Sequence, residues 1–225
     1  MKLIAIETFH KAQSKTKPDI EWKDSIQPTE QDKIKNIPFA GATATLDSDP
    51  LKAAARFYEI ARDRRSVRKF SSQPVDLAII ERCILAAGTS PSVGSEPWTF
   101  CVVSDGGLKA QIREIIESEG SDADKGYLTT VPHLVLIFVK SNYGSKTDYA
   151  EEATSIATGI LLCALQAAGL NSLVTTPLNC VRLVKLLGRP VGEKLLFLIP
   201  VGYAADDCQV PVLSRKPIEE ILVKY

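Results

Sequence analysis

The sequence predicts an α+β fold in which helices flank a central mixed sheet of four or five strands. Segments with apolar residues at helical spacing are interspersed with short, almost continuously apolar segments, although helices and strands do not alternate regularly. The chain has 225 residues, 45% of them hydrophobic, which is enough to bury one sizeable core. We expect a single domain over residues 50–225, preceded by a polar N-terminal arm over residues 1–49.

Apolar residues at helical spacing predict helices over residues 51–62, 75–87, 108–118, 149–169 and 181–187. Candidate N-caps precede the first helix at Asp47, Ser48 and Asp49. Gly88 and Gly188 follow two of the helices, and glycine commonly ends a helix. From Ile156 on, the 149–169 helix is apolar over most of its circumference, which indicates burial on more than one side, as in a domain centre or a subunit interface.

Short apolar segments predict strands over residues 99–104, 133–139, 171–176 and 194–201. Residues 218–223, near the C-terminus, are compatible with either a strand or a helix. His133 opens the second strand directly after Pro132. We therefore expect His133 at the edge of the core rather than in a catalytic site.

Composition and charge exclude several classes of function. Lys and Arg together number 27, as do Asp and Glu, so the chain has no overall positive charge for nucleic acid. The 5 cysteines lack C-x-x-C spacing and there are 2 histidines, so neither a disulfide framework, a metal site nor a Ser-His-Asp triad has support. A G-x-G-x-x-G dinucleotide fingerprint is also missing. If the chain is an enzyme, a bound cofactor must supply the difficult chemistry.

The apolar runs are too short for membrane insertion. The longest, Ile160–Ala168, is interrupted by Gln166 and is far shorter than the roughly 20 residues that a spanning helix needs. Met1–Ile6 is too short for the apolar region of a signal peptide. We expect a soluble, cytoplasmic protein, and the scattered cysteines fit a reducing compartment.

Four separate segments carry residue types suited to one flat ligand that bears a phosphate. Arg64-Arg65-Ser66-Val67-Arg68 places three guanidinium groups and a hydroxyl within five residues, and the arginine fork matches phosphate oxygens; a solvated basic turn is the alternative. The loop from Gly88 to Trp98 is rich in small residues, so its backbone can approach a ligand closely. Thr175–Asn179 lies at the end of a predicted strand, and Arg215-Lys216-Pro217 supplies a late basic residue.

In this order, the four segments resemble the FMN-dependent nitroreductase superfamily and, within it, the iodotyrosine deiodinase family. The resemblance extends from about Pro50 to the C-terminus, over Arg64–Arg68, Ala87–Thr89, Glu96–Phe100, Gly159–Leu162, Thr175–Cys180, Leu186–Pro190, Pro200–Tyr203 and Arg215–Pro217. It implies a nitroreductase-like FMN-binding fold and an intertwined homodimer with FMN at the subunit interface. It also implies removal of iodide from mono- or diiodotyrosine, with electrons ultimately from NADPH.

The resemblance also implies roles for individual residues. FMN would be held by Arg64, Arg65, Ser66, Val67 and Arg68, with Arg215 closing on the phosphate or the ring edge. Pro91 and Ser92 would contact the flavin face and the ribityl hydroxyls, a plain turn being the alternative. Val174, Thr175 and Thr176 would also contact the cofactor. Thr176 would be the catalytic residue, with its hydroxyl near flavin N5; strand packing of a β-branched side chain is the alternative for both threonines.

The chain departs from the family where the substrate would be covered. The deiodinases carry a lid that supplies a Glu, a Tyr and a Lys to the amino-acid substrate, and closing it keeps water out of the site. Here residues 119–131 would form a shortened lid region, in which the lid Glu and the lid Tyr have no counterpart. Lys125 matches the lid lysine, with an ordinary loop lysine as the alternative, and Gly94 matches the residue whose N–H meets the substrate phenolate.

We therefore expect FMN binding but weak binding of iodotyrosine. Two other functions stay open at this point: a generic FMN nitroreductase or quinone reductase, and a non-catalytic, flavin-binding regulatory subunit. We expect no counterpart of the membrane anchor of the animal family members, so the resemblance does not carry their membrane location here.

Overall fold

The computed structural model describes residues 45–92, 96–118, 125–140, 149–177 and 181–225. Its sheet has the strand order β1-β2-β4-β3, formed by β1 (Trp98–Val103), β2 (His133–Lys140), β3 (Asn171–Ser172) and β4 (Glu193–Gly202). These strands pair through antiparallel ladders, and the parallel pairing among the described residues is one isolated bridge between Ser66 and Ser172. The expectation of a mixed sheet is corrected accordingly, because apolar periodicity does not encode the direction in which strands pair.

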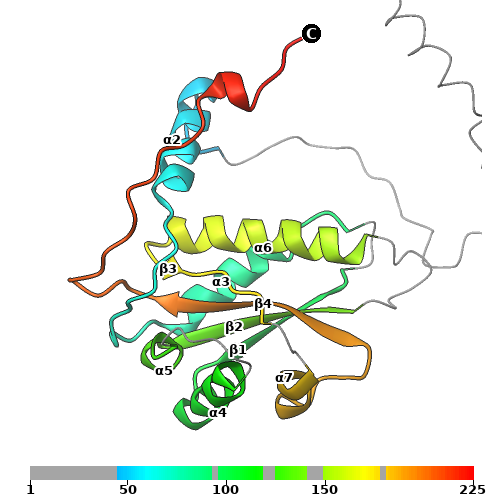
Figure 1. Ribbon diagram of the computed structural model, residues 1–225. Coiled ribbons are helices and arrows are strands. Elements are labelled where there is room, and N and C mark those ends of the chain that lie inside the picture. The colour runs from blue at the N-terminus through cyan, green and yellow to red at the C-terminus, as the bar shows by residue number, and fades with distance from the viewer. Residues whose placement is uncertain (1–44, 93–95, 119–124, 141–148, 178–180) are drawn as a thin grey trace, which may run out of the picture. The chain divides into compact units, whose positions relative to one another are not determined.

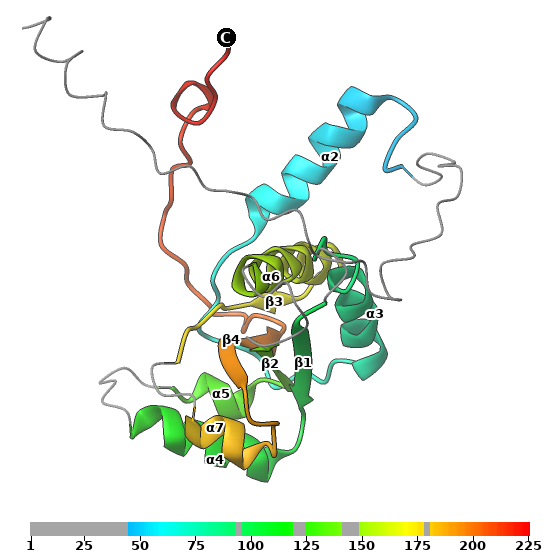
Figure 2. The same ribbon diagram turned by 90° about the vertical axis from the view of Figure 1, so that its right-hand side faces the viewer.

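Helices cover both faces of the sheet. In Figures 1 and 2, α3 (Leu77–Ala87) and α6 (Ala150–Ala167) lie on one side, and α4 (Gly106–Glu117), α5 (Tyr127–Thr130) and α7 (Val181–Leu186) lie on the other. The first described helix, α2 (Pro50–Asp63), contacts α6. The predicted α+β architecture, with helices flanking a central sheet, is confirmed.

The core consists of two clusters separated by β2, whose residues 133–139 are all buried. Leu134, Leu136 and Phe138 belong to the cluster on the α4 side, whereas Val135 and Ile137 belong to the cluster on the α3–α6 side. This division follows from the alternation of side chains along a strand. A strand that is apolar on both faces must lie in the middle of the layers, which explains the continuous apolar run in the sequence.

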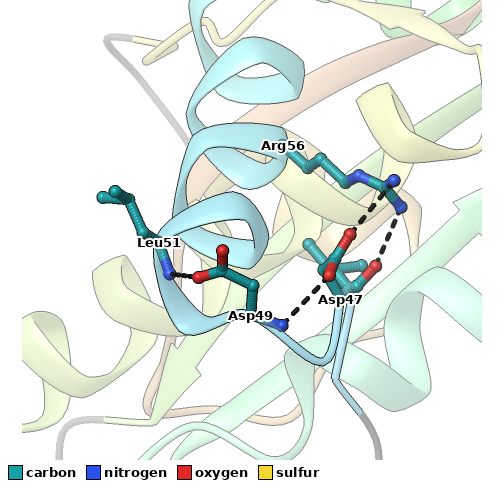
Figure 3. Close-up of polar contacts among 5 residues, drawn as sticks. Asp47, Asp49, Leu51 and Arg56 are labelled. Atoms are coloured by element: carbon teal, nitrogen blue, oxygen red, sulfur yellow. Dashed lines mark hydrogen bonds and ion pairs between the residues drawn. The ribbon is translucent and has the colours of Figure 1, made fainter.

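The helix starts follow from aspartate caps. Asp49 Oδ1 accepts from the Leu51 N–H at 2.9 Å, and Asp47 pairs with Arg56 at 3.1 Å and accepts from the Asp49 N–H at 3.0 Å (Figure 3). Asp76 and Asp105 cap α3 and α4 in the same way. These two helices therefore begin at residues 77 and 106, two residues away from the predicted starts at 75 and 108.

The two glycines predicted to end helices differ in backbone conformation, and one predicted strand is shorter than expected. Gly188 follows α7 with φ 59°, in the left-handed region that glycine favours, whereas Gly88 ends α3 with φ −64°, a conformation open to any residue. The strand predicted over 171–176 is shorter, because pairing with β4 stops after Ser172 and resumes at the bridge between Thr175 and Leu198. Residues 218–220 form a single 3₁₀ turn.

His133 was expected at the edge of the core, and it is buried at the start of β2. Its Nε2 lies 2.8 Å from the carbonyl oxygen of Val75, which can only accept, so this nitrogen carries the hydrogen. Nδ1 lies 2.7 Å from the Ser104 hydroxyl.

Across the described segments, none of the helices combines the length and the apolar character that a membrane crossing requires.

Candidate functional site

The arginine run and the late basic segment, far apart in the sequence, line one cavity of about 300 Å³. Its lining residues are Arg64, Arg65, Ser66, Arg68, Pro211, Leu213 and Arg215. Four of them are guanidinium cations and none is a carboxylate, so the cavity suits an anion with several oxygen acceptors. The structure thus brings together the first and the fourth of the four predicted segments.

Buried side chains between the arginines fix the conformation of the run. Val67 is 3% exposed and packs in the core cluster on the α4 side, and its N–H donates to the carbonyl of Ser172 at 3.1 Å. Phe70 is also buried, and the next residue, Ser71, donates its N–H to Tyr203. Val67 was predicted to bind the cofactor. Its side chain packs in the core, so a contact with a cofactor would not involve that side chain.

The threonine pair divides into a structural and an exposed member. Thr175 is half-buried, and its hydroxyl donates to the carbonyl of Leu198 at 2.9 Å, beside two backbone hydrogen bonds between the same residues. Thr176 is exposed, and Val174 packs partly against the core cluster on the α3–α6 side. Strand packing therefore accounts for Thr175, and Thr176 presents the accessible hydroxyl. Both lie three or four residues after Ser172, the partner of the arginine run.

The loop predicted to meet the flavin face is closed by a serine. Ser92 Oγ accepts from the N–H of Glu96 at 3.0 Å, and Glu96 has φ 42°, an unusual conformation for a residue other than glycine. Pro91 is exposed and Ser92 half-buried. Gly94, the predicted contact of the substrate phenolate, lies outside the described residues. Pro91 and Ser92 do not line the arginine cavity.

Lys125, the predicted substrate lysine, is half-buried just before α5, and its carbonyl accepts from the Leu128 N–H at 2.9 Å. It does not line the arginine cavity either. Residues 119–124 of the predicted lid region lie outside the described part of the chain.

The sequence analysis did not single out Lys109, a buried lysine of α4 that contacts the residues after α5. Lys109 on α4 is 7% exposed, and its Nζ donates to the carbonyl of Val131 at 2.6 Å, with that of Pro132 at 3.4 Å. Burial lowers the pKa of Lys109, an effect that Asp105 partly opposes. Its position three residues before the buried Ile112, on the apolar face of α4, is the signal that could have revealed it.

A second cavity, of about 700 Å³, opens between α2 and α6 and is almost entirely apolar. It is lined by Leu46, Phe57, Ile60, Ile156, Gly159, Ile160, Cys163, Ala164 and Ala167. Phe57 and Ile156 are 51% and 48% exposed, which is high for large apolar side chains. This accounts for the broad apolar circumference of the 149–169 segment, because α6 packs on the core with one side and faces this cavity with another.

Comparison with known proteins decides the family. A model described as the nitroreductase family matches residues 61–203. The chain belongs to the nitroreductase family. Iodotyrosine deiodinase of Drosophila melanogaster is 48% identical over 90% of this chain and 79% of that protein, and human iodotyrosine deiodinase 1 is 41% identical over 90% and 78%. Within the family, the chain therefore belongs with the iodotyrosine deiodinases, as its motifs predict.

Solved structures agree. A crystal structure of iodotyrosine deiodinase bound to FMN and 3-iodo-L-tyrosine matches with a TM-score of 0.66 and 28% identity, over 75% of this chain and 98% of that one. A nitroreductase family protein of Streptococcus pneumoniae has a TM-score of 0.64 at 18% identity, which supports the fold alone. The predicted nitroreductase-like fold is confirmed.

The Drosophila relative has additional residues within the region that aligns with this chain. The alignment with the Drosophila protein extends over 233 positions but covers only 90% of the 225 residues here, so roughly thirty of its positions have no residue in this chain.

Proposed function

We propose that this chain is an FMN-dependent oxidoreductase that removes iodide from mono- or diiodotyrosine. The observation that carries the proposal is the arginine cavity, which joins two segments predicted from the sequence to hold one phosphate. The proposed reaction, removal of iodide from iodotyrosine, is inferred from the fly and human relatives, which are both named iodotyrosine deiodinases. In that reaction a carbon–iodine bond is replaced by a carbon–hydrogen bond, which consumes two electrons and a proton and releases iodide.

The residues present fit the FMN phosphate. Four guanidinium groups can neutralise a phosphate dianion, and their planar forks give pairs of parallel hydrogen bonds to its oxygens. Ser66 adds a hydroxyl from the same wall of the cavity. Among the described residues that line the cavity, none is a carboxylate that would compete for these donors. When bound, FMN supplies the electron transfer that no side chain can provide.

The remaining residues would orient the ring and the substrate. Thr176 would offer its exposed hydroxyl near the reactive edge of the flavin, while Thr175 keeps the turn in place through Leu198. Pro91 and Ser92 would contact the ring face and the ribityl chain. Gly94 would donate its N–H to the substrate phenolate, and Lys125 would meet the carboxylate of the amino acid.

A homodimer would complete the site, because Pro91, Ser92 and Lys125 do not line the arginine cavity of their own chain. The apolar cavity between α2 and α6 supports this, since its half-exposed Phe57 and Ile156 would be covered by a second copy. Exposed apolar side chains near the C-terminus, among them Ile218, Ile221 and Val223, support it further. Intertwined subunits would bury both surfaces.

The short lid region would weaken substrate binding. Roughly thirty positions of the Drosophila relative lack a counterpart here, which agrees with a shortened segment between α4 and α5. With fewer groups to exclude water, charge pairs with the substrate zwitterion lose strength. We expect the dissociation constant of 3-iodotyrosine to be at least about tenfold higher than that of the Drosophila relative, which corresponds to one lost charge-assisted contact.

Anaerobic iodide release from 3-iodotyrosine tests the proposal. The FMN-loaded protein is reduced with dithionite, and NADPH is supplied in parallel, alone and with a flavin reductase, to identify the electron source. Release of one iodide per iodotyrosine consumed supports the proposal. Rapid turnover of nitroaromatics or quinones without iodide release identifies a generic nitroreductase. Bound FMN with neither activity identifies a flavin-binding regulatory subunit.

A further inference from the structure

The arginine cavity has two walls that come from distant parts of the chain. Arg64, Arg65, Ser66 and Arg68 form one wall, and Pro211, Leu213 and Arg215 form the other. The geometry of an anion site depends on how both walls are held, because a displacement of about 1 Å is enough to weaken a positioned contact. The second wall is the less constrained of the two.

The segment after β4 is at first well fixed. The bridge between Phe70 and Ala204, and the hydrogen bond from the Ala205 N–H to the Lys69 carbonyl, tie it to the end of the arginine run. Lys69 and Asp207 then form an ion pair, and the hydrogen bond from Lys69 lowers the pKa of Asp207. Up to Asp207, the backbone path is therefore set by several contacts.

Beyond Asp207 the contacts become few. Cys208 and Val210 pack partly against the core, and Arg65 Nη2 donates to the carbonyl oxygen of Pro211. In the described part of the chain, this hydrogen bond is the last one that joins the C-terminal segment to the rest of the domain. Val212 and Leu213 are 101% and 56% exposed, and the segment leaves the sheet without regular structure (Figure 2).

We propose that Arg65 is a positioning residue, which holds Pro211 and thereby places Arg215 at the cavity across from Arg64 and Arg68. Its guanidinium has five N–H donors, of which one serves Pro211, so others remain available to an anion. A single planar group thus contacts the carbonyl of the C-terminal segment and lines the anion cavity. Binding of a phosphate and fixation of the segment are therefore coupled, and the coupling is reciprocal.

Arg68 provides a matched control. It lines the same cavity and carries the same charge, but among the described residues no hydrogen bond joins it to the C-terminal segment. Arg65→Ala and Arg68→Ala remove equal charge from the cavity, whereas only the first removes the contact with Pro211. The inference rests on the proposed function for the identity of the anion, but not for the contact itself.

The test is limited proteolysis of the chain of residues 1–225, with and without saturating FMN. Chymotrypsin cleavage after Leu213 is followed by mass spectrometry of the released 214–225 peptide. We expect Arg65→Ala to accelerate this cleavage about tenfold without flavin, the effect of losing one hydrogen bond from a charged donor, and Arg68→Ala to stay within about twofold of the parent. Arg65→Lys, which keeps a donor, should lie in between.

Added FMN should slow the cleavage in the parent, and riboflavin, which lacks the phosphate, should not. In Arg65→Ala, FMN should no longer slow it. Equal cleavage of Arg65→Ala and Arg68→Ala in both conditions would overturn the inference. If the parent fails to bind FMN while the two variants still differ, the proposed function fails and the role of Arg65 stands. A circular dichroism melt verifies that each variant is folded, and Arg65→Lys replaces Arg65→Ala if the latter is not.

Discussion

Thr175 and Thr176 offer a sharp test of the site, because adjacent identical residues have different surroundings. The Thr175 hydroxyl donates to the Leu198 carbonyl at 2.9 Å, and that carbonyl also accepts from the Thr175 N–H at 3.0 Å. Thr175→Val keeps the shape and removes one hydrogen bond, without leaving the carbonyl unpaired. The expected loss is about 1 kcal/mol of folding free energy, or a melting temperature lower by roughly 2–4 °C for a chain of this size.

Thr176→Val changes an exposed residue, so its folding free energy should stay within about 0.5 kcal/mol of the parent. It would nevertheless remove the hydroxyl proposed to lie near the flavin. We expect iodide release to fall about tenfold or more in Thr176→Val, as for one lost hydrogen bond at the reacting centre, and to change less than about threefold in Thr175→Val below its melting temperature.

The assay combines thermal unfolding of each flavin-free variant with anaerobic iodide release at saturating FMN. Thr175→Val should lower the melting temperature with little effect on turnover, and Thr176→Val should lower turnover with little effect on the melting temperature. If Thr176→Val melts several degrees lower while turnover persists, or if Thr175→Val is the variant that stops iodide release, the assignment of the two hydroxyls is wrong.

Three further predictions follow from buried charges and exposed apolar surface. Arg189 donates two hydrogen bonds of 2.8 Å to the buried carboxylate of Glu193. Arg189→Ala leaves this carboxylate buried without its partner, so the free energy of unfolding in a urea titration should fall by about 3 kcal/mol. The double variant Arg189→Ala/Glu193→Ala should lose less than Arg189→Ala alone. Burial lowers the pKa of Lys109 in the folded chain below 10.5. At pH values between the folded and the unfolded pKa, the unfolded chain binds more protons at Lys109, so the free energy of unfolding rises with pH up to about 10.5. In urea titrations, the free energy of unfolding of the parent relative to Lys109→Met should therefore rise as the pH approaches about 10, and a fall would contradict the burial argument. Ile156→Glu should produce a monomer in light scattering, whereas Val191→Glu, at a fully exposed position outside the apolar cavity, should not; a dimeric Ile156→Glu would place the interface elsewhere.

The sequence predicted those parts of the molecule that depend on local pattern. The helices over 50–63 and 150–167 appear where apolar spacing and an aspartate cap or a long apolar face indicate them. The arginine run and Arg215 line one cavity, as expected from two segments that both carry guanidinium groups. Residue type was informative here since few other side chains suit a multivalent anion.

Features that depend on tertiary contacts escaped prediction. The direction of strand pairing, and the stop of β3 after Ser172, are set by partners that local periodicity does not reveal. Val67 lies among arginines, yet its side chain is a core anchor, because alternate residues of an extended segment face opposite sides. The contact of Arg65 with a backbone carbonyl 146 residues away leaves no signature in side-chain pattern.

The central claim is that the arginine cavity holds the phosphate of FMN, and comparing the affinities of FMN and riboflavin tests it most directly. The two flavins share the ring and the ribityl chain and differ in the phosphate. Quenching of flavin fluorescence should give riboflavin a dissociation constant at least about 100-fold higher, and Arg68→Ala should weaken FMN binding while leaving riboflavin unchanged. Equal affinities for the two flavins, or an Arg68→Ala variant that binds FMN as the parent does, would contradict it.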